Sequence, residues 1–325
     1  MDTANVELQE KPRRRWLPRM RFRLSTMLLT IALAATLLGW GIDHIEQRKQ
    51  VRALESHFEL SFSDDERAAL QYFADARCPI VMRAFHASTL GDEDLKWVSM
   101  LPTLDYLVVD NATDDGLVNV ARLKRLRSLT IMKSPTLSDR GITHLGELTN
   151  LEYLHLYDGQ LTDKAMESIG RLAQLKSLDV RGTRISSDGV AYLRDLRELQ
   201  ALRLSQNPDV DDRALEYIAQ LPELTHLSIS ASSVNGDGLN FLSQMPRLEV
   251  LVLQGSSIDG SGLDQLANAE SLRRLDLSFT SVGDDDIDKL ATLSQLETLA
   301  VYGTRVTPDG VNRLRAALPD CTVTD

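Results

Sequence analysis

The chain has 325 residues, of which 43% are hydrophobic and 26% are charged, so it can bury a sizeable core. Seven of its 36 Lys and Arg, but only three of its 47 Asp and Glu, lie in the first 42 positions. Residues 43–325 therefore carry 29 basic and 44 acidic side chains, a net charge of −15. Such a surface repels phosphate backbones, which argues against nucleic acid as a partner.

The chain begins with a basic segment that is followed by an apolar one. Residues 1–23 end in RRRWLPRMRFR, and residues 24–42 contain no charged side chain over 19 positions. A helix of that length spans ~28 Å, close to the thickness of a bilayer core. The positive-inside rule makes residues 1–23 a cytoplasmic tail. We therefore expect residues 24–42 to be a single-pass transmembrane signal anchor in the cell membrane, with the rest of the chain on the extracytoplasmic side.

The same segment has an alternative interpretation as a cleaved signal peptide. Ala32-Leu33-Ala34 matches the A-x-A cleavage pattern, although the apolar run continues for eight residues beyond it. Cleavage at this point would release the protein as an exported effector.

The next two segments favour helix but differ in role. Residues 43–62 are mostly polar, with too few apolar heptads for a coiled coil, and we interpret them as a solvated stalk. Ser63, followed by Asp64, Asp65 and Glu66, is typical of a helix start. Because a repeat array needs an end cap over its open core, we predict an N-terminal capping helix at residues 63–79.

Residues 80–325 form a domain of ten copies of one pattern, which restarts about every 24 residues. Each copy opens with L-x-x-L-x-L, and a truncated eleventh strand follows as Leu318-x-x-Cys321-x-Val323. The first copy is degenerate, because Arg83 occupies a leucine position. The copies open at Ile80, Leu104, Leu126, Leu151, Leu175, Leu199, Leu224, Leu248, Leu272 and Leu296.

The residues within one copy predict its local structure. The alternating leucines indicate a strand with one buried face. The segment Thr307-Pro308-Asp309-Gly310 offers a hydroxyl at the N-cap, proline at the first helical position and an acid near the positive helix end. Equivalent segments start at Ser138, Thr162, Ser186 and Asp211. Each copy is therefore expected to form a strand, a turn and a short helix.

The pattern resembles the leucine-rich repeat, L-x-x-L-x-L-x-x-N/C-x-L. The resemblance implies an α/β fold: a right-handed solenoid with parallel strands on the concave side and short helices on the convex side, here preceded by one transmembrane helix. Ser or Thr mostly replaces the usual asparagine, which resembles the ribonuclease-inhibitor-like and cysteine-containing subfamilies. Those positions are Ser134, Thr183, Ser232, Ser256, Thr280 and Thr304, and only Asn207 keeps the asparagine.

The sequence offers little support for catalysis, for a cofactor or for a metal. The six histidines lack HxxxH or HxH spacing, and no Ser/His/Asp motif, phosphate loop or dinucleotide fingerprint is recognisable. The recurring acids stand where helix starts need them. Among these recurring acids, Asp284-Asp285-Asp286 is the one local cluster, with weak ion binding as its alternative role. We therefore predict that the protein is not an enzyme and uses no cofactor.

The inward-facing strand positions remain for recognition. Aromatic and imidazole groups gather in the first half of the array and arginines follow, and Tyr and Arg are the residues that most often carry interface energy. We expect Asp179 to pair with Arg203, one strand away. The predicted protein-binding residues are Tyr106, Tyr153, His155, Tyr157, Arg181, Arg203, His226, Arg274 and Tyr302.

These observations favour a membrane-anchored, non-catalytic module that binds a protein or peptide through its concave face. The alternatives are a structural or assembly component of the cell envelope and the released effector described above. The charge of −15 is weak support for a basic partner.

Overall fold

The computed structural model describes residues 84–87, 92, 95, 99 and 104–325. The predicted tail, anchor, stalk and capping helix (residues 1–23, 24–42, 43–62 and 63–79) lie outside this part of the chain. Within the described residues, the helices are all too short or too polar to cross a bilayer.

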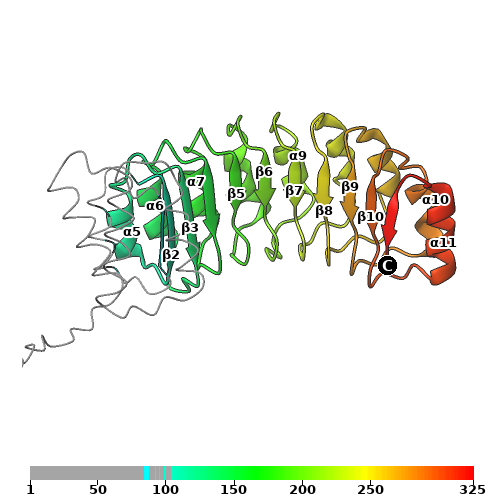
Figure 1. Ribbon diagram of the computed structural model, residues 1–325, viewed down its shortest axis with the longest axis horizontal. Helices are drawn as coiled ribbons and strands as arrows, with labels where there is room; N and C mark the ends of the chain where they lie inside the picture. Colours follow the sequence, from blue (N-terminus) through cyan, green and yellow to red (C-terminus); the bar gives the residue numbers. More distant parts are fainter. Residues whose placement is uncertain (1–83, 88–91, 93–94, 96–98, 100–103) are drawn as a thin grey trace, which may run out of the picture.

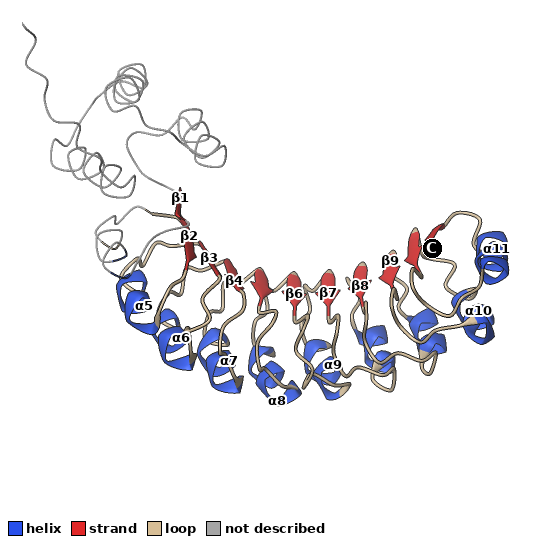
Figure 2. Cartoon of the chain, turned by 90° about the horizontal axis from the view of Figure 1, so that it is seen from below, coloured by secondary structure: helices blue, strands red, loops and turns tan. Residues whose placement is uncertain are grey.

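The strands form one 11-stranded parallel sheet whose spatial order follows the sequence from β1 to β11. They line the inner side of a curved solenoid, and the helices line its outer side (Figures 1 and 2). This confirms the predicted parallel sheet with short helices. The strands are β1 Ala84–Ala87, β2 Tyr106–Asp110, β3 Ser128–Met132, β4 Tyr153–Leu156, β5 Ser177–Asp179, β6 Ala201–Arg203, β7 His226–Ser228, β8 Val250–Val252, β9 Arg274–Asp276, β10 Thr298–Ala300 and β11 Thr322–Thr324.

The outer elements are short helices, and in two copies they are 3₁₀ helices alone. Ser138, Thr162, Ser186 and Thr307 cap their helices as predicted, because each hydroxyl accepts a backbone N–H in the first turn. The outer elements are α5 Asp114–Val120, α6 Asp139–Leu145, α7 Asp163–Ile169, α8 Ser187–Val190, η1 Ala191–Leu193, α9 Arg213–Ile218, η2 Leu239–Gln244, η3 Leu263–Asn268, η4 Asp284–Asp286, α10 Ile287–Leu290 and α11 Pro308–Ala317.

The leucine positions of the repeat form one continuous core between the sheet and the helices. Leu154, Leu178 and Leu202 are neighbours in register on β4, β5 and β6, and all three are fully buried. Because each copy packs only on its neighbours, the free energy of folding accumulates copy by copy along the array.

The first copy is offset by two residues from the prediction. We predicted a frame that opens at Ile80, but β1 pairs Phe85 with Leu107 of β2. The frame therefore opens at Met82, and Arg83 does not occupy a leucine position. This correction makes the first two copies equal in length, 22 residues each.

Hydroxyl groups at the usual asparagine position close the turn after β3, β5, β7, β8, β9 and β10. Ser232, for example, donates to the backbone oxygen of Ile229 at 2.8 Å. Asn207 does more, because its amide donates to the oxygen of Val180 in the preceding copy at 2.9 Å and accepts from the Thr183 hydroxyl at 2.7 Å. The other serines and threonines at this position keep the turn without a bond between copies, and Thr183 has one only because Asn207 accepts its hydroxyl.

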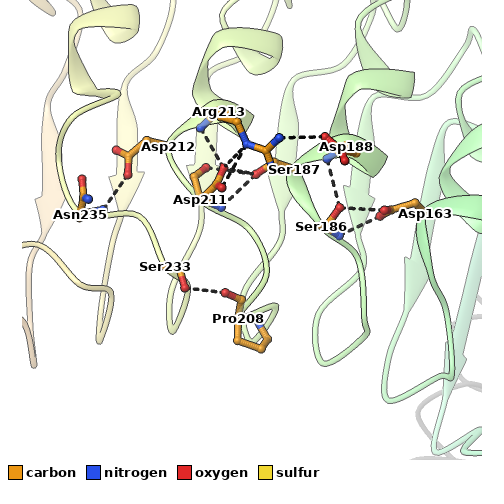
Figure 3. Close-up of polar contacts among 10 residues, drawn as sticks. All are labelled: Asp163, Ser186, Ser187, Asp188, Pro208, Asp211, Asp212, Arg213, Ser233 and Asn235. Atoms are coloured by element: carbon orange, nitrogen blue, oxygen red, sulfur yellow. Dashed lines mark hydrogen bonds and ion pairs between the residues drawn. The ribbon is translucent and has the colours of Figure 1, made fainter.

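Aspartates join the helix starts of successive copies (Figure 3). Asp163, the first residue of α7, accepts the backbone N–H of Ser186 at 2.8 Å and its hydroxyl at 2.7 Å. Since Ser186 caps α8, the acid of one copy holds the cap of the next. We predicted these acids as helix-start residues, and the structure adds this link. The same two bonds join Asp114 to Ser138, Asp139 to Thr162 and Asp284 to Thr307.

A glycine in the following helix makes room for this link. A Cβ atom at Gly189 would lie 2.3 Å from Oδ1 of Asp163. At Gly310 it would lie 2.2 Å from Oδ1 of Asp284. In these two copies the glycine of the helix start therefore leaves room for an acid 26 residues earlier, although Ala165 takes the same position in the copy that Asp139 holds.

Candidate binding surface on the concave face

Three rows of side chains cross the concave face, because the strands are parallel and in register. The first row reads Tyr106, Ser128, Tyr153, Ser177, Ala201, His226, Val250, Arg274, Thr298 and Thr322. The second row, two residues later, reads Val108, Thr130, His155, Asp179, Arg203, Ser228, Val252, Asp276, Ala300 and Thr324. The third row, two residues later again, reads Asp110, Met132, Tyr157, Arg181, Ser205, Ser230, Gln254, Ser278 and Tyr302.

Tyr157, Asp179 and Arg181 form a compact group that we name the Tyr–Arg cluster. Arg181 Nη2 lies 2.8 Å from Asp179 Oδ2, and its Cζ atom lies 4.8 Å from the centre of the Tyr157 ring. The Asp179 residue is only 1% exposed, and its burial is tolerable because the guanidinium compensates its charge. Arg181 is therefore held on one edge by a carboxylate and on one face by an aromatic ring.

The free side of the cluster faces solvent. The Arg181 side chain is 46% exposed, and it bonds the Asp179 carboxylate through Nε and Nη2 only. Burial, together with the nearby Asp179 carboxylate, raises the pKa of Tyr157 above its ordinary value. The phenol therefore keeps its proton at neutral pH. The cluster presents one fixed cation and one protonated phenol to an incoming group.

The predicted pair of Asp179 with Arg203 is wrong. The two residues are partners in register across β5 and β6, as the sequence indicated. The Asp179 carboxylate nevertheless bonds Arg181, which follows the same strand. The ring of Tyr157 holds the Arg181 guanidinium beside that carboxylate. Arg203 forms no ion pair among the residues that the structure describes.

His155 borders the cluster on β4. Its Nε2 atom lies 3.3 Å from the Ser177 hydroxyl, and its ring centre lies 6.2 Å from that of Tyr157. Burial lowers the pKa of His155 below its ordinary value; the charges of Arg203 and Arg181 lower it further, and Asp179 opposes them. The imidazole is therefore neutral at pH 7, and at that pH it contributes hydrogen bonding rather than charge.

The other predicted residues are spread along the face. Tyr106 and Tyr153 lie in the first row on either side of β3, with 41% and 38% of their surface exposed. His226 is exposed, with Nδ1 2.8 Å from the Thr225 hydroxyl. Arg274 is exposed and forms no ion pair within residues 104–325. Among the described residues, none of these four side chains bonds to the cluster or stacks on it.

Tyr302 belongs to a second aromatic group that sequence reasoning missed. Its ring meets that of Phe279 edge to face, with centres 5.2 Å apart, and the two residues are 57% and 53% exposed. We name them the Phe–Tyr pair. Phe279 follows β9 in a left-handed turn with φ of 59°, a conformation unusual for a bulky residue. A Cβ atom at Gly303 would lie 2.7 Å from the Phe279 ring, so the glycine leaves room for it.

The described residues contain no cluster of three or more His, Cys, Asp and Glu side chains that could hold a metal ion. Two carboxylates of the acidic run in η4 bond other groups of this chain. Asp284 holds Thr307, while Asp286 accepts the Gly283 N–H at 3.0 Å and lies 3.4 Å from the Lys289 amine. These carboxylates close turns and join copies.

Comparison with known families matches most of the array. The family described as "Leucine-rich repeat region" matches residues 96–265, and "Leucine Rich repeat" matches residues 268–291. Leucine-rich repeat-containing protein 23 of Homo sapiens is 37% identical over 86 residues. That match covers 26% of this chain and only 25% of the human protein.

Two solved structures share the fold. An internalin, inlF, from Listeria monocytogenes superposes with a TM-score of 0.54 at 22% identity, over 71% of this chain and 69% of that one. TLR13, solved in a complex with ssRNA13, superposes with a TM-score of 0.53 at 19% identity, over 75% of this chain and 40% of that one. At such identities the likeness concerns the fold alone.

Proposed function

This chain belongs to the leucine-rich repeat family, and from that premise we propose that it is a non-catalytic recognition module that binds a protein or peptide through its concave face. The observation that carries the proposal is the Tyr–Arg cluster. Arg181 is fixed by a buried carboxylate and an aromatic ring, yet nearly half of its side chain faces solvent. A side chain that is ordered before binding loses little entropy when a partner arrives.

The proposal extends to the repeat type and to the location. The period of about 24 residues and the hydroxyl at the asparagine position support the ribonuclease-inhibitor-like or cysteine-containing type. The 19 uncharged positions of residues 24–42 support a membrane anchor. In this arrangement residues 1–23 are the cytoplasmic tail, residues 43–62 the stalk and residues 63–79 the cap. The repeat domain, residues 80–325, then stands on the extracytoplasmic side.

A protein or peptide fits the surface better than nucleic acid does. TLR13, which shares the fold, was solved in a complex with ssRNA13. In this chain, by contrast, residues 43–325 carry a net charge of −15, which opposes the approach of a phosphate backbone. A structural component of the envelope remains the competing function, and it needs no ordered cation on the concave face.

The test is proximity labelling from the tagged repeat domain in intact cells. We expect the Tyr153→Ala/Tyr157→Ala variant to lose specific labelled partners that the wild-type protein retains. Tyr192→Ala is the matched control, because Tyr192 is 47% exposed on the outer element η1. Membrane fractionation of the same tagged protein distinguishes an anchored chain from a released one. An unchanged set of partners in the double variant would contradict recognition by the concave face.

A further inference from the structure

The described concave face exposes cations more than acids. Of the acids in its three rows, Asp110 and Asp179 are buried and lie beside Lys133 and Arg181, at 3.1 and 2.8 Å. The third acid, Asp276, accepts a backbone N–H at 2.8 Å.

The arginines of the three rows have fewer bonds to other side chains of the face. Arg203 and Arg274 form no ion pair within the described chain, and Arg181 leaves nearly half of its side chain exposed beside its one carboxylate. The face of a strongly acidic domain therefore displays accessible positive groups. This local charge argues against the basic partner that the net charge alone suggested.

The two aromatic groups lie along the same edge of the sheet. The Tyr–Arg cluster stands at the carboxyl ends of β4 and β5, and the Phe–Tyr pair stands after β9 and β10. Their nearest members, Arg181 and Phe279, are four strand spacings apart and the centres of the two groups are five apart, which is ~19–24 Å. The third row between them carries only short or uncharged polar side chains, which are Ser205, Ser230, Gln254 and Ser278.

We propose that the concave face binds one extended, acidic peptide segment that crosses the strands from the Tyr–Arg cluster to the Phe–Tyr pair. This inference rests on the proposed function and adds the chemistry of the partner. At ~3.3 Å per residue, about six or seven extended residues cover the distance between the two groups. Carboxylates of the segment meet Arg181 and Arg203, and an apolar side chain packs on Phe279 and Tyr302.

The spacing of the cations favours a short acidic peptide over a nucleic acid. A duplex carries one negative charge per ~1.7 Å, and binding commonly neutralises about six to ten phosphates. Arg181, Arg203 and Arg274 instead stand on β5, β6 and β9 or at their ends. Three cations spread over five strands match two or three carboxylates in one segment, whereas a polyanion would meet the acidic remainder of the domain.

The backbone at Phe279 supports a role in binding rather than in folding. The equivalent turn positions in the other copies are held by residues that tolerate a left-handed conformation better or are less bulky. A phenylalanine in this conformation carries strain and still exposes more than half of its surface. Strain that adds no buried contact is expected where the side chain serves a partner.

The experiment selects random 12-residue peptides, displayed on phage, against the purified full-length chain. We expect the selected peptides to be net acidic and to carry an aromatic or large aliphatic residue. Their affinity should fall at least tenfold for Arg203→Gln/Arg274→Gln and should weaken with added salt. Both arginines are free of ion pairs within the described chain, so the double variant tests charge without breaking a salt bridge there.

A second variant separates binding from stability. Phe279→Gly relieves the left-handed strain, so the melting temperature should stay the same or rise while peptide affinity falls about fivefold or more. Failure to select any peptide, selection of neutral or basic peptides, or displacement of the peptides by poly(U) RNA would overturn the inference. Neutral or basic peptides that still require Tyr153 and Tyr157 would leave the proposed function standing. Partners that survive loss of those tyrosines would refute the proposed function itself.

Discussion

The junction between neighbouring copies is built in two ways. The copies that contain α7 and α8 use one, and the copies that contain η2 and η3 use the other. In the former, Asp163 begins a helix and holds the cap of the next with two hydrogen bonds. In the latter, Gly236 and Gly260 occupy the aspartate position, and neither 3₁₀ helix has a side-chain cap. There the backbones approach directly, since a Cβ atom at Gly262 would lie 2.2 Å from the oxygen of Gly236.

This difference shows that one position sets the bond between copies, and in these four copies it also goes with the helix type. An aspartate at this position bonds the capping hydroxyl of the next copy, as Asp139, Asp163 and Asp284 do, and the next copy then forms an α-helix. A glycine there removes the carboxylate and permits closer contact, and a 3₁₀ helix follows. Asp212, at the boundary, still uses its carboxylate but accepts backbone N–H groups, including that of Gly238 at 2.7 Å.

The largest expected effect comes from placing an aspartate in a glycine-type copy. Gly236 has φ of 122°, and a Cβ atom there would lie 2.1 Å from the backbone oxygen of Ser261. Gly236→Asp should therefore cost about 3 kcal/mol or more of unfolding free energy, measured by urea denaturation. Gly255→Asp is the control, because Gly255 is left-handed with open space around it, and it should cost about 1–2 kcal/mol. A more stable Gly236→Asp variant would show that the two junctions are interchangeable.

A smaller loss should follow when an acid-linked junction is cut. Asp163→Ala removes the acceptor of both the N–H and the hydroxyl of Ser186, and should cost about 2 kcal/mol in the same measurement. Asp188→Ala is the matched control, because Asp188 is exposed and its carboxylate is paired with Arg213, at 3.2 Å. That change should stay within about 0.5 kcal/mol. Equal losses in the two variants would mean that the junction adds no stability.

The smallest effect should be a change in acid sensitivity. Hydrogen bonds from the hydroxyl and backbone of Thr307 lower the pKa of Asp284 below its ordinary value of 3.8. A folded pKa below the unfolded one stabilises the protein above the unfolded pKa, and this contribution disappears as pH falls through the folded pKa. Asp284→Asn should therefore flatten the pH dependence of the unfolding midpoint below pH ~4, followed by circular dichroism. Asp285→Asn, at the neighbouring position, is the control, and it should preserve more of the pH dependence of the unfolding midpoint than Asp284→Asn does.

Most of the array was predictable because its period is strong. Leucines at fixed spacing can bury one face only as in-register strands, so the sheet order and the rows followed directly. The first copy failed where Arg83 obscured the frame, and pairing with β2 corrected it. The hydroxyl at Ser232 was also predictable, because a serine in a tight turn has few other bonds to make.

The candidate site was predictable as a set of positions but not as a set of contacts. Two arginines are candidates to pair with Asp179: Arg203 on the next strand and Arg181 two positions later in the chain. The position of Arg181 against the Tyr157 ring decided which of them forms the ion pair. Phe279 gave no strand signal, because its role depends on a left-handed turn that phenylalanine seldom adopts. The bond from Asp163 to Ser186 joins residues 23 positions apart, and only the stacking of the copies brings them together.

The acid link also gives the copies a fixed order. A copy that starts its helix with Thr162 fits behind one that supplies Asp139, because both its hydroxyl and its N–H are already assigned. Behind a copy that carries Gly236 it would lose both acceptors. Duplication or exchange of copies in the gene is therefore tolerated only where the donor and acceptor ends match, so each junction limits which neighbours evolution can place beside a given copy.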